Sequence, residues 1–526
     1  MTKRYQVVII GGGPVGVALA VGLGLRGVSC LLVERHLQPQ RIPKGQNLTQ
    51  RTLEHFHFWG LVDELRAARV MPRDYPIGEL TAYESLLSDY WHASAGRELV
   101  RQFFFQANER LPQYQMEGVL RKRMETLSYV ETRFGYTAKT IGQDANGVRA
   151  TIVDRAGATE EIEADYLVGC DGGHSIVREQ AGIARGGTDF DQQMILAVFR
   201  SRELHERLKR FPERSTYRVM HPDLKGYWQF FGRVDVGEGW FFHAPVPPGT
   251  KPDDRALKKL IEKAAGFEFA CEFDHLGFWD LRVAVADRYR AGRVFIAGDA
   301  AHSHPPYGGF GLNNGLEDAV NLAWKLTAAV QGWGGDALLQ SYDDERRPVF
   351  KEIAEELIAA RIEEDGAFLD RYNPHRDRAE FEKAWRERES DVGSRVQVYE
   401  PNYEGSPVVL GPPGGVTRAT GTHLLKARPG HHLAPQPLSS GRNVFEELGS
   451  GLALLAFDAD ASSVAALERA AQTLKVPLTV IRDSFAGGRE AYESRLVLVR
   501  PDQHVAWSGD ICADADAVMK QVVGQA

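Results

Sequence analysis

Residues 5–34 constrain the fold of this chain more than any other segment. The short apolar run at residues 6–10 is typical of a strand buried on both faces, and residues 17–26, rich in Ala, Val and Leu, predict a helix. A second apolar run, at residues 29–33, ends at Glu34. Between the first strand and the helix stand Gly11, Gly13 and Gly16, in the spacing of dinucleotide-binding βαβ units. The sequence therefore predicts a Rossmann-like nucleotide-binding unit.

Each position of this motif has a physical role. Gly11 allows the tight turn, Gly13 lets a pyrophosphate approach the backbone, and Gly16 lets the helix pack closely on the strand. The N-terminus of the helix offers unpaired N–H groups and a partial positive charge to the phosphates. Glu34 stands where a ribose hydroxyl is usually bound. An ordinary Gly-rich turn is the alternative, but the strand, helix, second strand and terminal acid all favour the dinucleotide interpretation.

Composition excludes several classes of protein. The 526 residues suffice for about two to four domains, and 43% hydrophobic with 25% charged residues is typical of a soluble globular protein. The net charge of −8 argues against nucleic-acid binding. No apolar run approaches a membrane span, and a strand begins within five residues of the N-terminus, so we expect no membrane contact, no signal peptide and a cytoplasmic location. The four cysteines lie far apart without a CxxC pair, so we expect neither a metal site nor a disulfide framework.

Changes in residue pattern divide the chain into an α/β protein of three parts. Residues 1–190 and 286–400 predict one discontinuous nucleotide-binding domain with bracing helices, within which residues 99–105 read as extended. Residues 191–285 are β-rich and aromatic, with a hairpin turn at 236–239, and predict an α+β substrate domain to which residues 70–110 contribute. Residues 401–450 contain the Pro and Gly clusters of a linker. Residues 451–526 alternate strand and helix patterns and predict a small separate α/β domain.

Two further motifs follow predicted strands. A run from Asp171 to Arg178 comes directly after the buried strand at residues 166–170, and Gly298-Asp299 follows the strand at residues 293–297. A Gly-rich loop at residues 307–311 then precedes a long helix that begins near Leu312. The N-terminus of that helix would direct backbone N–H groups toward whatever precedes it.

The three motifs together resemble those of the flavoprotein aromatic hydroxylases, the single-component monooxygenases related to para-hydroxybenzoate hydroxylase and phenol 2-monooxygenase. The resemblance covers roughly residues 5–360 and is strongest over residues 298–319. It implies a Rossmann-like FAD-binding domain, FAD as cofactor, NADPH or NADH as transient co-substrate, and O₂. The implied reaction is hydroxylation of a phenolic or other activated aromatic substrate, a small aromatic molecule, through a flavin C4a-hydroperoxide. A single dinucleotide fingerprint disfavours the disulfide reductases.

The resemblance implies roles for individual residues. Glu34 would bind the adenosine ribose of FAD, and Asp299 its ribityl or pyrophosphate part. Lys44 stands where the family usually has Arg, which keeps the charge but loses the bidentate fork. The N-terminus of the last helix would stabilise the negative charge of a reduced flavin. The residues implied in FAD binding are Gly11, Gly13, Pro14, Val15, Gly16, Glu34, Arg35, Lys44, Gln113, Asp171, Arg178, Gly298, Asp299, Gly311, Leu312 and Asn313.

Catalytic candidates rest on position alone. Pro306 would form a rigid, donor-free wall on the flavin face where oxygen adds. A base that deprotonates the phenol would make the ring more nucleophilic. His302 and His304 are interpreted as loop or cap residues, because nothing in their spacing requires catalysis. The candidates for the base are Gln46, Asn47, Tyr217, Gln229 and His243.

The C-terminal block resembles the thioredoxin-like domain appended to phenol hydroxylases and polyketide hydroxylases. It has no CxxC, and Cys512 stands alone, so we expect packing or subunit contact rather than redox activity. A homodimer is compatible with the sequence. Two alternative functions stay open: a Baeyer–Villiger or epoxidising oxygenase acting on an aromatic polyketide, and a non-catalytic flavin-binding protein within a complex.

Overall fold

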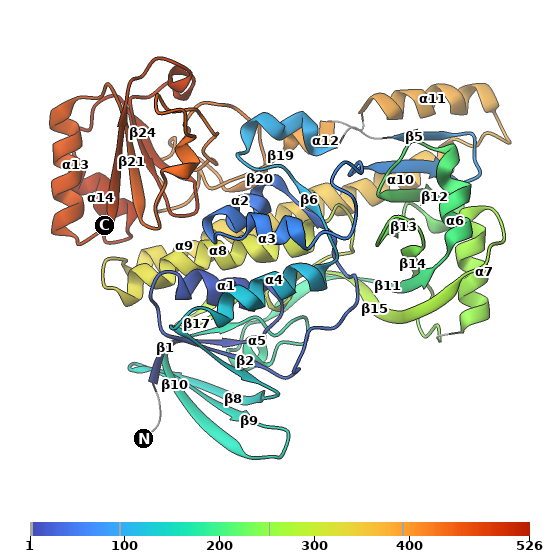
Figure 1. Cartoon of the computed structure of the whole chain (residues 1–526), viewed down its shortest axis with the longest axis horizontal. Coiled ribbons are helices and arrows are strands. Elements are labelled where there is room, and N and C mark those ends of the chain that lie inside the picture. The colour runs from blue at the N-terminus through green and yellow to red at the C-terminus, as the bar shows by residue number, and fades with distance from the viewer. Residues whose placement is uncertain (1–3, 94–95, 252, 392–393) are drawn as a thin grey trace.

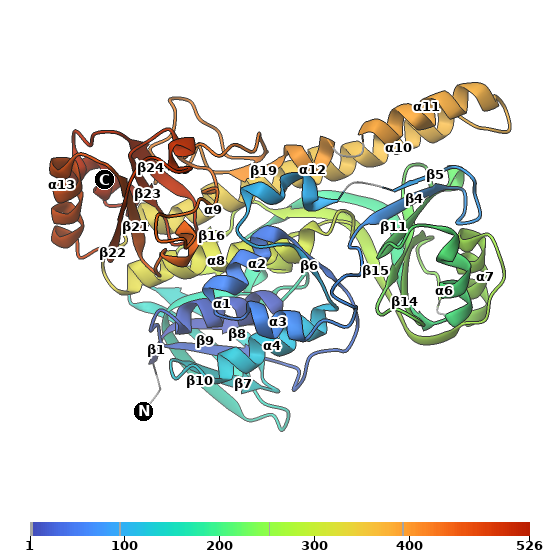
Figure 2. The ribbon, with the colours of Figure 1, turned by 45° about the horizontal axis from the view of Figure 1, so that its top comes forward.

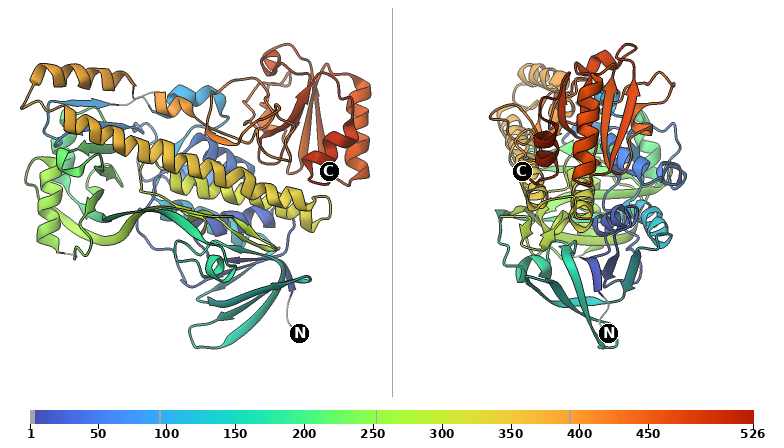
Figure 3. Two further views of the ribbon diagram at one scale, coloured as in Figure 1. Left: turned by 180° about the vertical axis from the view of Figure 1, so that it is seen from behind. Right: turned by 90° about the vertical axis from the view of Figure 1, so that its left-hand side faces the viewer.

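The protein is described by a computed structural model covering residues 4–93, 96–251, 253–391 and 394–526. Figure 1 shows three parts: an N-terminal sheet at the bottom, a β-rich domain at the right and a C-terminal domain at the upper left. Seen from behind, one long helical rod runs from the C-terminal domain to the β-rich domain (Figure 3). Among the described helices, none combines the length and apolar character that crossing a bilayer requires.

The N-terminal sheet confirms the Rossmann-like prediction. Strand β1 lies between β2 and β10, and β7 and β17 extend the sheet on either side, with all of these neighbours parallel. Helix α1 (Pro14–Gly24) connects β1 to β2 and is buried along nearly its whole length. The strands of this sheet are β1 (Arg4–Ile10), β2 (Cys30–Glu34), β7 (Val130–Phe134), β8 (Thr137–Asp144), β9 (Gly147–Val153), β10 (Thr159–Gly169), β16 (Arg290–Ala291) and β17 (Val294–Ile296).

The β-rich domain is a second, mixed sheet in the order β18-β15-β11-β14-β13-β12-β4-β5. The predicted hairpin is present, with Phe230 of β13 opposite His243 of β14, and strands β4 and β5 also pair into this sheet. The strands are β4 (Glu79–Tyr83), β5 (Trp91–Ala93), β11 (Arg185–Arg200), β12 (Thr216–Met220), β13 (Trp228–Arg233), β14 (Gly239–Val246), β15 (Glu272–Ala286) and β18 (His302–Ser303).

Successive residues of this sheet face two different environments, because side chains alternate along a strand. Phe231 and Phe242 are fully buried in a core beneath α6 (Arg202–Arg207) and α7 (Asp254–Ala265), the helices that cover the outer side of the sheet in Figure 2. Their neighbours Phe230 and His243 line a cavity instead. One hairpin thus supplies both a domain core and a cavity wall.

The long helices connect the three parts. Helix α8 (Phe310–Val330) begins two residues before the predicted start and packs against α1, where Gly22 permits the approach: a Cβ at Gly22 would lie 2.9 Å from the Cβ of Ala323. The predicted bracing helix lies within a rod made of α9 (Asp336–Glu352), a π-helical segment (Ile353–Ala359) and α10 (Ala360–Arg371). Helix α11 (Arg378–Asp391) follows this rod in the chain.

The C-terminal domain has the predicted order of strand, helix, strand, hairpin and helix. Its four-stranded sheet has the order β22-β21-β23-β24, with β21 parallel to β22 and antiparallel to β23. The elements are β21 (Leu452–Phe457), α13 (Ala461–Thr473), β22 (Leu478–Asp483), β23 (Leu496–Val499), β24 (Val505–Gly509) and α14 (Ala515–Val522).

Two segments differ from their predicted character. Residues 401–450, predicted as a linker, pack into the C-terminal core: Leu433, Val444 and Phe445 are fully buried with strands β21 and β23. The Pro and Gly residues of this segment lie in its turns. The apolar residues that it buries are scattered and follow neither a helical nor a strand spacing. Residues 99–105, predicted as extended, fall largely within a 3₁₀ helix (Arg97–Phe103).

A buried charge network joins the C-terminal domain to the long helices. The guanidinium of Arg500, at the end of β23, donates to both carboxylate oxygens of Glu345 in α9, at 2.6 and 2.8 Å, and to Asp502 at 2.6 Å. Lys325 of α8 donates to Glu345 at 2.6 Å. All four side chains are fully buried. Removing one partner would leave the others uncompensated in a dry interface.

We predict that Arg500→Ala destabilises the protein by about 3–5 kcal/mol, because Glu345 and Asp502 would keep buried charges without their main cation. The matched control is Arg482→Ala, which breaks a solvent-exposed pair with Glu468 at 3.0 Å and should change stability by less than about 1 kcal/mol. Urea unfolding followed by fluorescence measures both. Equal midpoints for the two variants would contradict the assigned role of the network.

Candidate active site

The loop between β1 and α1 forms a cradle with open backbone. Gly11 has φ +109°, and a Cβ there would lie 2.2 Å from the carbonyl oxygen of Cys170, so only glycine fits. A Cβ at Gly16 would lie 1.9 Å from the Gly11 carbonyl oxygen, which explains the close packing of helix on strand. By contrast, a Cβ at Gly13 would meet nothing within 4 Å. Among the described residues no side chain caps the start of α1, so its first N–H groups face the open space beside Gly13.

Glu34 lies at the edge of this cradle. One carboxylate oxygen accepts from the backbone N–H of Gly12 and the other from that of His36, both at 2.7 Å. These bonds fix the carboxylate at the end of β2 and leave each oxygen a further lone pair. Glu34 and Arg35 line the same cavity as Gly13, and the role of Glu34 in binding a ribose stays a prediction.

A cavity of about 1580 Å³ extends from the cradle to the β-rich sheet. Single-ligand sites usually occupy about 300–1,000 Å³, so this volume accommodates a dinucleotide together with a second molecule. The predicted site residues that line it are Gly11, Gly13, Pro14, Val15, Glu34, Arg35, Lys44, Gln46, Asn47, Gln113, Asp171, His243, Asp299, Pro306, Gly311 and Leu312.

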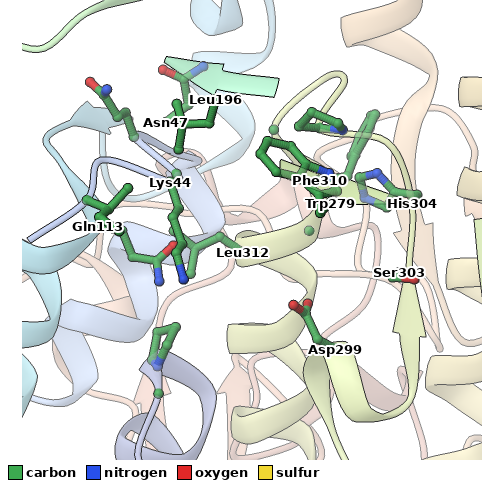
Figure 4. A pocket seen from close by; sticks show the side chains of 18 of the residues that line it. Lys44, Asn47, Gln113, Leu196, Trp279, Asp299, Ser303, His304, Phe310 and Leu312 are labelled. Atoms are coloured by element: carbon green, nitrogen blue, oxygen red, sulfur yellow. The ribbon is translucent and has the colours of Figure 1, made fainter. Parts of the chain in front are cut away.

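Lys44 and Gln113 line the cavity close to Leu312 (Figure 4). The amide of Gln113, the first residue of α4 (Gln113–Glu125), donates to Glu117 at 2.7 Å, and its backbone N–H donates to the carbonyl of Gly45 at 2.8 Å. In the part of the chain that the structure describes, the ammonium of Lys44 forms no ion pair. Its charge is therefore available to a ligand.

Asp299 follows β17 and points into the cavity (Figure 4). Its carboxylate is exposed there and has no hydrogen-bond partner among residues 4–93, 96–251, 253–391 and 394–526. The adjoining Gly298 has φ +59°, and a Cβ there would lie 2.8 Å from Cγ2 of Val15. The tight turn at Gly298 thus brings Asp299 beside the first turn of α1.

The start of α8 forms the opposite wall. Gly309, with φ +69°, precedes the helix, and no side chain in the described part of the chain caps the helix start. Gly311 and Leu312, in its first turn, line the cavity. Asn313 faces the other way: its amide nitrogen donates to the carbonyls of Gly309 and Asn47 at 2.6 and 2.9 Å. Asn313 therefore positions the wall rather than lining it.

Three other predicted residues also stand behind the wall of the cavity. Gly16 and Gly298 are packing positions, as described above. Arg178 donates to the carbonyls of Ala300 and Gly173, at 2.9 and 3.1 Å, and so ties the second motif to the third. Asp171 lines the cavity, yet its carboxylate accepts from Ser175 Oγ at 2.5 Å and so stabilises the turn before α5 (Ile176–Gln180).

His302 and His304, interpreted from the sequence as loop or cap residues, have defined surroundings. His302 lies in β18 and is buried, and its Nε2 is 2.6 Å from Oδ2 of Asp318. The other carboxylate oxygen of Asp318 accepts a hydrogen bond from Arg346 at 2.8 Å. His304 lines the cavity, and burial lowers its pKa to about 4, so its ring is neutral at pH 7. The pairing of His302 with Asp318, 16 residues further along the chain, was not predicted from the sequence.

The far end of the cavity has an aromatic wall. His243 stacks on Phe230 at a ring distance of 4.9 Å and meets the ring edges of Phe241 and Trp279 at 5.4 and 5.2 Å. Burial lowers the pKa of His243 to about 3, which makes it a weak base at neutral pH. Its Nδ1 has no hydrogen-bond partner within the described chain.

The other candidate bases divide into two groups. Tyr217 and Gln229 are buried in the sheet and do not line the cavity. Gln46 and Asn47 do line it, and Gln46 is only 5% exposed with neither side-chain amide atom bonded to any described residue. A buried amide without a partner is rare unless a ligand satisfies it.

Sequence analysis did not identify several residues at the far end. Arg110 of β6 (Glu109–Arg110), Trp279 of β15 and Arg218 of β12 all line the cavity. Each reaches it through strand pairing with segments distant in sequence, such as Arg110 opposite Asn47 of β3 (Asn47–Leu48). No local motif marks any of them.

Comparisons with known proteins agree with this geometry. The sequence model described as "FAD binding domain" matches residues 4–356, and the one described as "Aromatic-ring hydroxylase, C-terminal" matches residues 426–526. The chain belongs to the FAD-dependent aromatic-ring hydroxylases. The family resemblance noted from the three motifs is thereby confirmed, and the enzyme is an FAD-dependent monooxygenase of aromatic compounds.

Similar proteins match along the whole chain. The enzyme is 30% identical to 4-methyl-5-nitrocatechol 5-monooxygenase of a Burkholderia species, over 98% of this chain and 96% of that protein. It is also 30% identical to rifampicin monooxygenase of Streptomyces venezuelae, over 96% of both. A solved ternary complex of aklavinone-11 hydroxylase with FAD and aklavinone superposes with a TM-score of 0.84 at 26% identity, covering 100% of both chains.

The residues of the cradle fit FAD. The open backbone at Gly13 and the uncapped start of α1 suit a pyrophosphate, and Glu34 suits a ribose. The unpartnered carboxylate of Asp299 suits hydroxyl donors, and the orphaned amide of Gln46 suits a ring edge with both donors and acceptors. The cavity therefore offers complementary groups along the length of the dinucleotide.

We predict that Asp299→Ala purifies with little bound flavin, because losing a charge-assisted hydrogen bond weakens binding by about 10- to 100-fold. Asp89→Ala is the matched control, since that carboxylate is 98% exposed on the surface. Visible absorbance of the purified proteins gives the FAD content. An Asp299→Ala protein as yellow as the wild type would show that this carboxylate does not hold the cofactor.

Proposed function

We propose that this flavoprotein uses NADPH or NADH and O₂ to insert one oxygen atom into a multi-ring phenolic substrate. The observation that carries the proposal is a cavity of about 1580 Å³ whose lining includes both the FAD cradle and an aromatic-walled end. When bound, FAD supplies the activation of oxygen. The protein's own residues hold the cofactor, orient the ring and exclude water.

The walls of the cavity support distinct tasks for the protein. Phe230, Phe241 and Trp279 offer flat apolar faces that orient an aromatic ring system. Pro306, which carries no N–H donor, forms a rigid part of the loop before α8. The N–H groups at Gly311 and Leu312 favour negative charge at the adjacent edge of the cofactor. Apolar side chains at this end of the cavity displace water from a bound ring, which limits side reactions with water.

Two observations support a large substrate. The volume exceeds what FAD alone requires, and the solved aklavinone-11 hydroxylase, which superposes on the whole chain, is named for a substrate that it holds together with FAD. The Baeyer–Villiger and epoxidation alternatives share the same cofactor and differ in the product. The non-catalytic alternative is disfavoured, because the similar proteins are named as monooxygenases.

A panel of phenols and multi-ring aromatics tests this function. We predict that a productive substrate accelerates NADPH or NADH oxidation at least about tenfold over the ligand-free rate and yields one hydroxylated product per nucleotide oxidised. Absorbance follows the nucleotide, and mass spectrometry and NMR identify the product. A lactone or epoxide would favour the alternatives, and nucleotide oxidation that no aromatic compound stimulates would contradict the proposal.

A further inference from the structure

Tyr307 connects two walls of the cavity that come from different elements. It lies in the loop between β18 and α8, directly after Pro306, which lines the cavity. Its side chain is 1% exposed and packs on the indole of Trp228, with the two ring centroids 4.1 Å apart. Trp228 is the first residue of β13, and Phe230 of the aromatic wall stands two residues further along the same strand. The contact thus joins the loop that carries Pro306 to the strand that carries Phe230.

The hydroxyl of Tyr307 binds backbone groups rather than side chains. It accepts a hydrogen bond from the N–H of Trp228 at 3.2 Å and donates to the carbonyl of the same residue at 3.4 Å. Burial raises the pKa of Tyr307, so the hydroxyl keeps its proton at pH 7 and remains both donor and acceptor. A phenylalanine at this position would keep the ring contact and lose both bonds.

An interruption of the sheet explains why Trp228 needs this partner. The ladder between β13 and β14 ends at the pair Phe230–His243. The same register would place Pro245 opposite Trp228, and proline offers no N–H with which to extend the ladder. The hydroxyl of Tyr307 therefore supplies the hydrogen bonds that a strand partner would otherwise make.

The loop that carries Tyr307 has few other attachments. Among the described residues, no other side-chain hydrogen bond joins residues 304–308 to a different element. The loop ends in two consecutive glycines with positive φ, Gly308 at +71° and Gly309 at +69°. Because glycine has the widest choice of backbone conformations, the loop depends on an anchor for a defined position.

Trp228 is a fixed point on which to anchor the loop. Its indole N–H donates to the buried carboxylate of Asp365 in α10 at 2.5 Å. The guanidinium groups of Arg218 and Arg361 lie 3.7 and 4.3 Å from the centroid of its ring. The loop therefore takes its position from the strand, and not the strand from the loop.

We propose that Tyr307 is a positioning residue that sets the distance between the loop of Pro306 and the strand of Phe230, and thereby couples nucleotide oxidation to hydroxylation. This inference rests on the proposed function and assigns a residue to its control. In coupled turnover, two electrons come from the nucleotide and two from the ring C–H bond, and one atom of O₂ enters the ring while the other leaves as water. With a misplaced ring, the nucleotide and a proton from solvent reduce O₂ to H₂O₂, and the ring stays unchanged.

Small displacements are sufficient to decide between these outcomes. A shift of about 1 Å in the position of a reacting group can slow a reaction by about 100-fold. The loop and the strand contribute opposite walls to the place where the ring reacts, so their separation sets how the ring lies. A change in this separation would affect the reaction step more than the binding of the ring.

Tyr307→Phe tests the hydroxyl while keeping the ring. With a substrate from the panel, we expect kcat for the hydroxylated product to fall about tenfold and KM to stay within about twofold. The share of oxidised nucleotide that ends as H₂O₂ should rise at least about threefold, as measured by a peroxidase assay beside chromatography of the product. Tyr492→Phe is the matched control, because it removes a buried hydroxyl that bonds the carbonyl of Ala434 at 2.6 Å in the C-terminal domain. A purely structural role for Tyr307 would lower the thermal stability of both variants and leave the share of H₂O₂ unchanged in both.

Hydrogen exchange supplies a readout that does not depend on turnover. In the FAD-loaded wild type, the amide of Trp228 should exchange at least about tenfold more slowly than in an unstructured peptide. Tyr307→Phe should accelerate the exchange of this amide and of those at residues 307–311, whereas Tyr492→Phe should not. Mass spectrometry with electron-transfer fragmentation resolves these amides, and FAD content and thermal unfolding show whether each variant is folded.

Two results would overturn the inference. One is a Trp228 amide that exchanges in the wild type as fast as in an unstructured peptide, which requires no variant. The other is a folded Tyr307→Phe protein, with normal FAD content, that produces the same share of H₂O₂ as the wild type. Either result leaves the proposed function intact as long as the wild type hydroxylates an aromatic substrate. A wild type that hydroxylates no member of the panel instead contradicts the proposed function, and this inference with it.

Discussion

The close approach of two helix N-termini is the contact on which the site depends. Val15, in the first turn of α1, packs against Gly298 and against Gly315 of α8, where an added Cβ would lie 2.8 and 2.7 Å from Cγ2 of Val15. This contact brings two uncapped helix starts, and their partial positive charges, to one cavity. Two such ends repel each other, so a ligand that carries negative charge at both places satisfies an otherwise unfavourable arrangement.

The same cavity depends on the alternation of one hairpin. Phe231 and Phe242 stabilise the β-rich domain from within, while Phe230 and His243 face the ligand space. A shift of one residue in register would exchange core and cavity side chains. The stability of this domain and the shape of the substrate end are therefore set by the same strand pairing.

The nucleotide-binding part was predictable because its signals are local. Strand, glycine turn, helix and terminal acid lie within 30 residues, so Gly11, Gly13 and Glu34 were placed from the sequence. The C-terminal elements were predictable for the same reason. Arg110 was not, because its position in the cavity wall arises from pairing with Asn47, 63 residues away in the chain. Residues 401–450 were read as a linker because their buried side chains follow neither a helical nor a strand period.

The buried network of Lys325, Glu345, Arg500 and Asp502 has a consequence for the modular evolution of such enzymes. Each half of the protein contributes one cation and one anion to it, and the pair between Arg500 and Glu345 crosses the interface, so separating the halves would leave both of these side chains without their main partner across it. A C-terminal domain transplanted from a relative would need matching charges at all four positions. The two halves are thus constrained to change as a pair, even though the cavity lies almost wholly in the first of them.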